Sequence, residues 1–193
     1  MIRLATDADI PAILDIYAPY VLHTSHSFEY TVPSLAEFTQ RFRHHTHYCP
    51  WLVWEEQGQI MGYAYGAPAF QRAAYAWCAE VSVYLSPEGQ GRGMGRRLYE
   101  ILEALLWRLG YRVLYAIITS ENTGSLAFHR ALGYRVTAEL PGCGYKFGRR
   151  LGTVWMEKTA NFVDIPTNFP ALWEDIVKND GILQNILANL SLS

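Results

Sequence analysis

The sequence contains few cysteines, and their positions suggest no pairing. There are three in 193 residues, at Cys49, Cys78 and Cys143, without a Cys-x-x-Cys pair. An odd number of scattered cysteines supports neither a disulfide framework nor a zinc site. The pattern is typical of a reducing compartment, and we expect no metal ion.

The sequence also lacks runs of lysine or arginine. Its formal net charge is −2, and no basic stretch marks a nucleic-acid or membrane-surface patch. No segment approaches the ~20 consecutive apolar residues of a membrane span, and residues 1–4 show no signal-peptide pattern. We therefore expect a cytoplasmic protein with no nucleic-acid and no membrane partner.

The composition that remains is typical of a folded globular domain. Half of the residues are hydrophobic and 18% are charged, which argues against disorder. Periodicity and turn residues predict strands at residues 2–5, 51–56, 59–66, 75–85, 111–119, 134–140 and 151–158, and helices at about 6–21, 34–43, 95–109 and 122–132. This order predicts an α/β (α+β) fold, a mixed sheet with antiparallel hairpins and βαβ crossovers.

The chain changes character after Lys158. Pro166 and Pro170 interrupt it, and apolar residues at helical spacing follow. We therefore divide the chain into a domain at residues 1–158 and a helical extension at 159–193. The extension is expected to pack against the body or against a second subunit.

The predicted strand at 75–85 contains one acidic residue among apolar ones. Alternation places Glu80 on the same face as Ser82 and Tyr84. A carboxylate in a partly desolvated cleft has a raised pKa and can act as a general base. The alternative is that Glu80 pairs with a cation or lies at a solvated sheet edge.

A glycine-rich turn follows this strand and leads directly into a helix. It reads Gln90-Gly91-Arg92-Gly93-Met94-Gly95-Arg96. The glycines let backbone amides approach a ligand, and the start of the helix favours a pyrophosphate. The Walker pattern and the dinucleotide fingerprint are both absent. The alternative is a turn that binds nothing.

This turn resembles the acetyl-coenzyme A signature of the GCN5-related N-acetyltransferases, and residues 2–158 follow the element order of that family. The sequence is most similar to the phosphinothricin and methionine sulfoximine N-acetyltransferases within it. The matching stretches are residues 24–28, 72–77, 79–85, 122–134 and 144–146. The resemblance implies a mostly antiparallel central sheet flanked by helices, and acetyl-coenzyme A as co-substrate without a metal.

The resemblance also implies which residues hold the donor. Backbone atoms of Val83, Tyr84 and Leu85 should pair with the pantetheine arm. The pyrophosphate should lie against Gln90, Gly91, Arg92, Gly93, Met94, Gly95 and Arg96. Asn122, at the start of the next helix, should reach the arm near the thioester.

A second catalytic candidate comes from the same resemblance. His129 lies at a position where many members of the superfamily carry a tyrosine that protonates the leaving thiolate. Histidine titrates near neutrality and can serve as acid or base. We expect Glu80 to be the base and His129 its partner, although the sequence leaves their order open.

The resemblance assigns the acceptor side to Phe28, Arg72, Tyr75 and Thr119. We expect the acceptor to be a small amino-acid-like amine of the phosphinothricin or methionine sulfoximine type, and the enzyme to be a homodimer. Arg150 and Gly152 stand where relatives carry an aromatic residue and an acid, and Thr119 replaces a glycine of some relatives. Peptide N-termini, polyamines and aminoglycosides remain alternative acceptors, and a non-catalytic acyl-coenzyme A-binding module is a third possibility.

Overall fold

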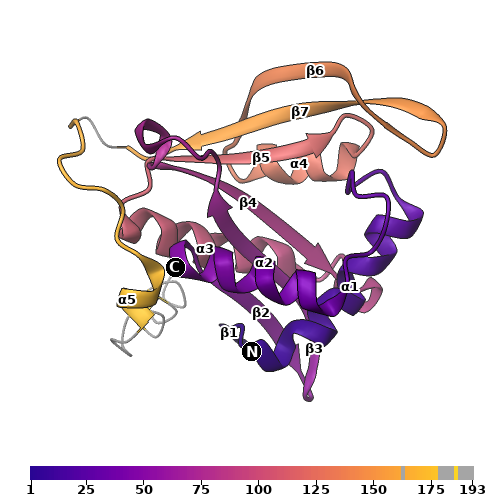
Figure 1. Cartoon of the computed structure of the whole chain (residues 1–193), viewed down its shortest axis with the longest axis horizontal. Helices are drawn as coiled ribbons and strands as arrows, with labels where there is room; N and C mark the ends of the chain where they lie inside the picture. The colour runs from indigo at the N-terminus through magenta and orange to yellow at the C-terminus, as the bar shows by residue number, and fades with distance from the viewer. Residues whose placement is uncertain (162–163, 178–184, 187–193) are drawn as a thin grey trace.

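Seven strands form one mixed sheet at the centre of the computed structural model, which describes residues 1–161, 164–177 and 185–186 (Figure 1). The strand order is β1-β2-β3-β4-β5-β7-β6. The strands are β1 (Ile2–Leu4), β2 (Trp51–Glu56), β3 (Gln59–Pro68), β4 (Cys78–Leu85), β5 (Val113–Thr119), β6 (Arg135–Lys146) and β7 (Arg149–Thr159). Among these described strands β4 and β5 are the one parallel pair. The predicted mixed, mostly antiparallel sheet is confirmed.

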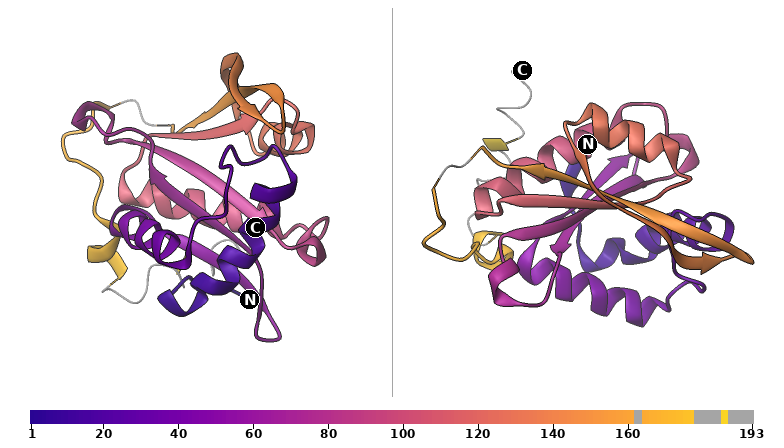
Figure 2. Two further views of the ribbon diagram at one scale, coloured as in Figure 1. Left: turned by 45° about the vertical axis from the view of Figure 1, so that its right-hand side comes forward. Right: turned by 90° about the horizontal axis from the view of Figure 1, so that it is seen from above.

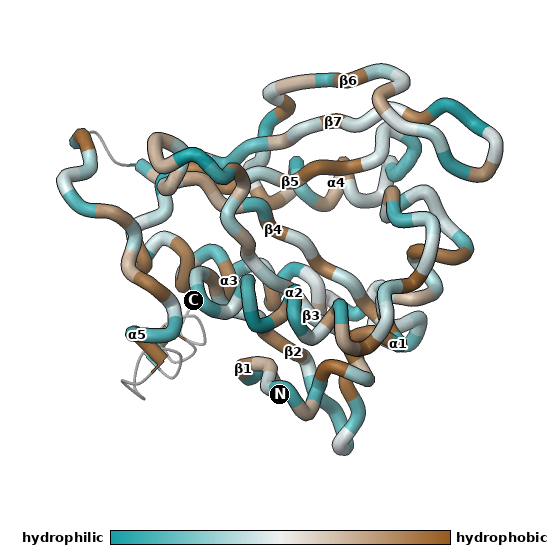
Figure 3. Tube along the Cα trace, viewed as in Figure 1, coloured by the Kyte–Doolittle hydropathy of each residue, from teal (hydrophilic) through white to brown (hydrophobic). Residues whose placement is uncertain are grey.

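Helices cover both faces of the sheet (Figure 2). The helices α1 (Ile10–His23) and α2 (Leu35–Tyr48) pack on one face, and α3 (Met94–Leu109) and α4 (Thr123–Ala131) on the other. The shorter helices are η1 (Asp7–Asp9), η2 (Ala73–Tyr75), η3 (Pro87–Gly89) and α5 (Trp173–Val177). Hydrophobic residues follow β4 and β5, whereas hydrophilic residues gather at the outer end of the β6–β7 hairpin (Figure 3). Each face of the sheet therefore has its own apolar core.

A capping box at Ser34 starts α2, the helix predicted at about residues 34–43. The Ser34 hydroxyl accepts the Glu37 N–H, and the Glu37 carboxylate accepts the Ser34 N–H. The predicted end of this helix at Arg43 is wrong, because α2 continues to Tyr48. The apolar stripe is confined to its first half, where Phe38 and Phe42 are buried, so periodicity gave no signal for the second half.

The strand predicted at 75–85 begins later, at Cys78. Tyr75 donates its N–H to Arg72 and Ala76 donates to Ala73, which closes the short helix η2 instead. The hairpin β6–β7 is longer than predicted, because a register shift between Leu140 and Gly144 carries the pairing past the proline.

The two crossovers differ. Strand β4 connects through α3 to its parallel neighbour β5. Strand β5 connects through α4 to β6, but β7 lies between them. The second predicted βαβ unit is therefore split by an inserted antiparallel strand.

The described part of the C-terminal extension packs on the body of the domain. Ala171 donates its N–H to Leu109, and Trp173 is buried in the core beside α3. Ile182, Leu187 and Leu190 are among the apolar residues at helical spacing that predicted helix after Pro170, and they lie outside the described residues. No helix in the described ranges is long and apolar enough to cross a bilayer.

Candidate functional site

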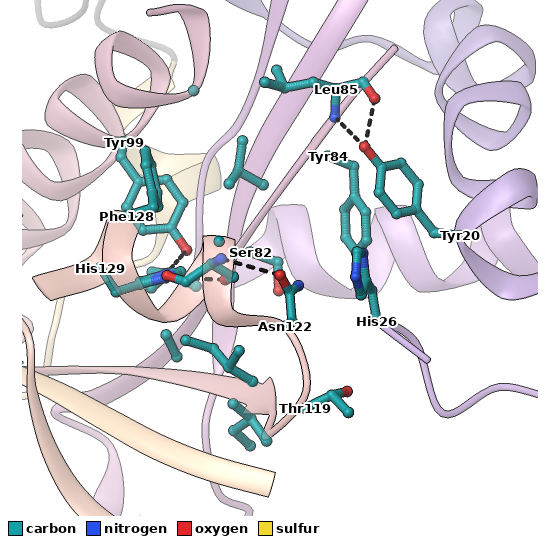
Figure 4. A pocket seen from close by; sticks show the side chains of 18 of the residues that line it. Tyr20, His26, Ser82, Tyr84, Leu85, Tyr99, Thr119, Asn122, Phe128 and His129 are labelled. Atoms are coloured by element: carbon teal, nitrogen blue, oxygen red, sulfur yellow. Dashed lines mark hydrogen bonds between the residues drawn. The ribbon is translucent and has the colours of Figure 1, made fainter. Parts of the chain in front are cut away.

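The parallel strands β4 and β5 separate after a short paired segment. They pair only from Cys78–Glu80 on β4 to Val113–Tyr115 on β5. Beyond this point a cavity of about 460 Å³ opens between residues 81–85 and residues 116–119 (Figure 4). Its volume lies in the usual range for small-molecule sites.

One edge of β4 faces this cavity. Ser86 donates its N–H to Met61 on β3. Because backbone groups alternate in direction along a strand, those of Val83 and Leu85 are directed to the opposite edge. An extended ligand can pair there as an added strand.

A tyrosine that the sequence reasoning missed occupies the end of this edge. The Tyr20 hydroxyl donates to the Leu85 carbonyl oxygen at 2.6 Å and accepts the Leu85 N–H at 3.4 Å. The Gln90 side chain donates to the same hydroxyl at 3.3 Å. A ligand that pairs with Leu85 therefore has to displace Tyr20, whereas Val83 needs no such change.

The glycine turn exposes its backbone as its composition suggested. Gly91 and Gly93 have φ of +71° and +78°, and a Cβ at either would meet nothing within 4 Å. Gly93 is the N-cap of α3, and Gly95 lines the cavity. The first amides of α3 have no intrahelical acceptor, so this end of the helix can bind an anion.

The side chains of this turn point elsewhere. The Arg92 guanidinium binds the Glu56 carboxylate at 3.0 Å, and Met94 is buried in the core. Arg96 is exposed. The turn therefore offers a bound anion mainly its backbone.

Asn122 lies at the rim of the cavity as the N-cap of α4. Its Oδ1 accepts the Ser125 N–H at 3.0 Å (Figure 4). This bond fixes the carboxamide. Its Nδ2 group makes no hydrogen bond to the described part of the chain and can donate to a ligand.

His129 is held from both sides inside the cavity. It is 3% exposed, its Nδ1 lies 2.8 Å from the Ser125 carbonyl oxygen, and its Nε2 lies 2.9 Å from the Tyr99 hydroxyl. A carbonyl oxygen only accepts, so Nδ1 carries the proton and Nε2 accepts from Tyr99. Burial lowers the pKa of His129, which keeps the imidazole neutral and able to take up a proton.

Glu80 lies where β4 and β5 separate. Its side chain is on the face of the sheet opposite to the one that α4 and His129 cover. It is the last residue of β4 that pairs with β5, opposite Tyr115. Burial raises the pKa of its carboxyl group, and its side chain makes no hydrogen bond or ion pair with the residues that the structure describes. It does not line the cavity, but it shares a strand face with Ser82 and Tyr84, which do.

The predicted acceptor residues are not gathered in the cavity, with one exception. Thr119 lines it and donates its hydroxyl to the Ser25 carbonyl oxygen. The Phe28 ring lies against Gly144, outside the lining. Arg72 and Tyr75 lie on the exposed segment at η2.

A buried lysine anchors the loop that carries Phe28. Lys146 is 2% exposed and its ammonium donates to the carbonyl oxygens of Val21, Thr24 and Ser27 at 2.7, 2.9 and 2.6 Å. Residues 144–146 carried part of the resemblance, yet no local signal indicated this anchoring.

The cavity thus unites about half of the predicted residues. Its lining includes Val83, Tyr84, Leu85, Gln90, Gly91, Gly95, Thr119, Asn122 and His129. It also includes Tyr20, His26, Ser82, Tyr99, Ser125 and Phe128, which were missed. Helical spacing offered one signal, because Tyr99 follows Gly95 by four residues and so lies on the same face of α3.

Comparison with known proteins points to one family. The family described as acetyltransferase (GNAT) domain matches residues 2–155. The chain is 38% identical over 172 residues to a phosphinothricin N-acetyltransferase from Alcaligenes faecalis, with 84% of each chain covered. It is 37% identical over 157 residues to an L-methionine sulfoximine/L-methionine sulfone acetyltransferase from Salmonella typhimurium (strain LT2), covering 81% of this chain and 92% of that protein.

The fold is similar to that of a solved member. The crystal structure of a GNAT superfamily phosphinothricin acetyltransferase from Sinorhizobium meliloti, in complex with AcCoA, matches with a TM-score of 0.82 at 36% identity. The match covers 87% of this chain and 93% of that one.

Proposed function

Because this chain belongs to the acetyltransferase (GNAT) domain family, we propose that it transfers the acetyl group of acetyl-coenzyme A to the primary amine of a small amino-acid-like molecule. The single observation that carries this proposal is the opening between β4 and β5, which joins a free strand edge to an anion-binding helix start. The named relatives act on phosphinothricin and methionine sulfoximine, so the proposed acceptors are compounds of that type.

The residues present fit a coenzyme A thioester. The backbone of Val83 offers a donor and an acceptor to an amide-containing arm, and Asn122 offers a donor from the other side of the cavity. The open amides after Gly91 and Gly93 suit a pyrophosphate. When bound, the thioester would supply an activated acyl group.

We assign the first proton transfer to Glu80. An ammonium group must lose a proton before its nitrogen can attack a carbonyl carbon. Glu80 is suited to this because its carboxylate has no cationic partner among the described residues and burial raises its pKa. A raised pKa strengthens the base and brings it closer to the pH at which it works.

The acceptor's acidic groups are assigned to Arg72 and Tyr75. Both lie on the exposed segment just before β4, and a guanidinium binds carboxylates and phosphinates well. Arg150, a departure from the relatives' pattern, donates to the Gly142 carbonyl oxygen of its own hairpin at 3.2 Å. It is therefore engaged locally, and we assign it no acceptor contact.

We further propose that residues 1–158 form the catalytic domain and that the enzyme is a homodimer. Two features support a second copy at this end of the sheet. The outer edge of β6 pairs with no other strand among the described residues, and exposed apolar side chains lie along the β6–β7 hairpin: Val136, Leu140, Tyr145 and Phe147. Light scattering coupled to size-exclusion chromatography tests the assembly, and a monomeric mass would contradict it.

A coenzyme A release assay tests the proposed reaction. The purified chain is mixed with acetyl-coenzyme A and with methionine sulfoximine, phosphinothricin, ordinary amino acids, a peptide, a polyamine or an aminoglycoside. Thiol release with the amino-acid analogues supports the proposal. Release only with a peptide, polyamine or aminoglycoside would reassign the acceptor, and binding of the thioester without release from any amine would favour a non-catalytic module.

A further inference from the structure

The Tyr99 hydroxyl contacts the His129 imidazole in the wall of the cavity. Tyr99 is fully buried on α3, His129 is 3% exposed on α4, and both line the cavity. The hydroxyl points at the imidazole, 2.9 Å from its Nε2 (Figure 4). The resemblance to known acetyltransferases implies a direct catalytic part for His129 and none for Tyr99.

The hydrogen bonds around His129 fix the direction of proton donation. The Ser125 carbonyl oxygen lies 2.8 Å from Nδ1, closer than the Ser125 hydroxyl at 3.3 Å. The proton of the neutral imidazole is therefore on Nδ1, and Nε2 must accept the Tyr99 proton. Both imidazole nitrogens are thus engaged. The Tyr99 oxygen makes no other hydrogen bond to the residues that the structure describes, so its lone pairs can accept a proton from a ligand.

Resting on the function proposed above, we propose that the Tyr99 hydroxyl is the catalytic group on this side of the cavity and that His129 acts only through it, as a proton store. As the new N–C bond forms, the Tyr99 oxygen accepts the proton that the amine nitrogen sheds, while its own proton moves to His129 Nε2. As the C–S bond breaks, its electron pair stays on sulfur. The imidazolium then returns its proton to the Tyr99 oxygen, which passes a proton to the thiolate.

The protons balance without another reactant. The first proton of the ammonium leaves through Glu80 to solvent before attack. The second travels from nitrogen to His129 and back to sulfur, so Tyr99 and His129 end as they began. Burial suits both partners to this task, because it holds the imidazole neutral and keeps the phenol protonated by raising its pKa.

Variants of the two residues test the relay by turnover. Tyr99→Phe should lower kcat by about 100-fold, which is within the range of general acid–base catalysis, with little change in the KM for acetyl-coenzyme A. His129→Asn should lower kcat by a similar factor. The double variant should be no slower than the slower single variant, because each substitution removes the same proton pathway.

Tyr134→Phe is the matched control. The Tyr134 ring also packs against the His129 ring, at 5.2 Å between centroids, but its hydroxyl makes no hydrogen bond to the imidazole. This variant should keep kcat within about threefold of the parent, well below the effect of losing a general acid or base. Wild-type-like turnover of Tyr99→Phe, or losses that multiply in the double variant, would overturn the relay.

A second measurement does not depend on turnover. In protein labelled with ¹⁵N-histidine and free of acetyl-coenzyme A, the His129 resonances, assigned with His129→Asn, should show the Nδ1-protonated neutral tautomer. Tyr99→Phe should shift the Nε2 resonance toward that of an unbonded imine nitrogen. An Nε2-protonated tautomer in the parent protein would overturn the relay.

The two proposals fail in different ways. A parent protein that is inactive with every amine contradicts the proposed function. An active parent with an unaffected Tyr99→Phe contradicts only the relay.

Discussion

Burial shifts the two candidate proton carriers in opposite directions. It raises the pKa of Glu80 and lowers that of His129, because a low-dielectric setting disfavours the charged form of each. The neutral imidazole is therefore ready to accept a proton. The carboxyl group is a base only above its raised pKa, so the proposal that Glu80 is the base predicts that this pKa sets the acid limit of the activity.

The variant Glu80→Gln tests that assignment. It keeps the size of the side chain but removes the base, so kcat should fall by at least about 100-fold. Calorimetry should show acetyl-coenzyme A binding unchanged, since Glu80 does not line the cavity. In the parent protein kcat/KM should fall as the pH drops through the raised pKa of Glu80. Unchanged turnover of the variant would remove Glu80 from the mechanism.

The same variant should be more stable than the parent at neutral pH. A carboxyl group whose pKa is raised on folding costs stability wherever it is ionised, and that cost vanishes below its unfolded pKa of about 4.3. Thermal melts should therefore show a higher Tm for Glu80→Gln than for the parent at pH 7.5, and no difference in Tm between the two at pH 4. Equal melting temperatures at pH 7.5 would contradict the desolvation of Glu80.

At the scale of elements, a variant in the glycine turn before α3 can distinguish the effect of backbone strain from the loss of a ligand contact. Gly93 and Gly58 both have φ of +78° and open space where a Cβ would lie. Alanine at either position should cost about 1–2 kcal/mol of stability for the left-handed backbone. Only Gly93→Ala should also raise the KM for acetyl-coenzyme A, by about tenfold for each ~1.4 kcal/mol of lost binding.

Steady-state kinetics on both variants distinguish the two effects. Gly58→Ala lies in the β2–β3 turn and serves as the control for strain alone. A Gly93→Ala enzyme with an unchanged KM for the donor would show that the turn does not contact it.

Lys146 connects the β6–β7 hairpin to the loop after α1. Its ammonium donates to three carbonyl oxygens, and Lys146→Met would remove these three hydrogen bonds, at a cost of about 3 kcal/mol. Because this loop carries His26, which lines the cavity, the KM for the acceptor amine should rise more than that for acetyl-coenzyme A.

Arg149→Met is the control for Lys146→Met. Arg149 lies on the same hairpin but forms an exposed pair with Glu121, and such pairs contribute little. Equal kinetics and equal melting temperatures for the two variants would contradict the anchoring role of Lys146.

The sequence predicted the elements where its signals were local. Apolar runs joined by a turn marked β2 and β3, alternation marked β4, and the capping box at Ser34 marked the start of α2. Boundaries failed where a distant partner decides them. The segment at 75–77 could pair as a strand by its residues, but Trp77 stacks on Phe169 and the turn at η2 closes first.

The features of the candidate site also differ in whether their sequence signals are local or depend on distant residues. A glycine pattern and strand alternation are short-range, so the turn and the edge of β4 could be predicted. Tyr20 and Lys146 could not, because each acts on backbone atoms far away in the chain, at Leu85 and at the loop after α1. The hydrogen bond between Tyr99 and His129 likewise joins two helices through their packing.

At the scale of the whole molecule, the described part of the C-terminal extension packs against the folded body. The family match ends at residue 155, yet the described residues beyond it contact three parts of the domain. Trp77 donates its indole N–H to the Asn168 carbonyl oxygen, and Glu174 pairs with His47 on α2 at 2.9 Å. Trp173 is buried against the core at 5% exposure.

Two variants, Trp173→Ala and Phe169→Ala, measure how much this segment stabilises the fold. Trp173→Ala removes a large side chain from the core, which should lower the free energy of unfolding by about 3 kcal/mol or more. For a chain of this size that is a drop of roughly 10 °C in Tm. Phe169→Ala, whose ring is 64% exposed and stacks on Trp77, should cost less than about 1.5 kcal/mol. Calorimetric melts of both variants test this order, and equal small losses would mean that the segment rests on the domain without stabilising it. The KM values should stay near those of the parent in either variant, because neither residue lines the cavity between β4 and β5.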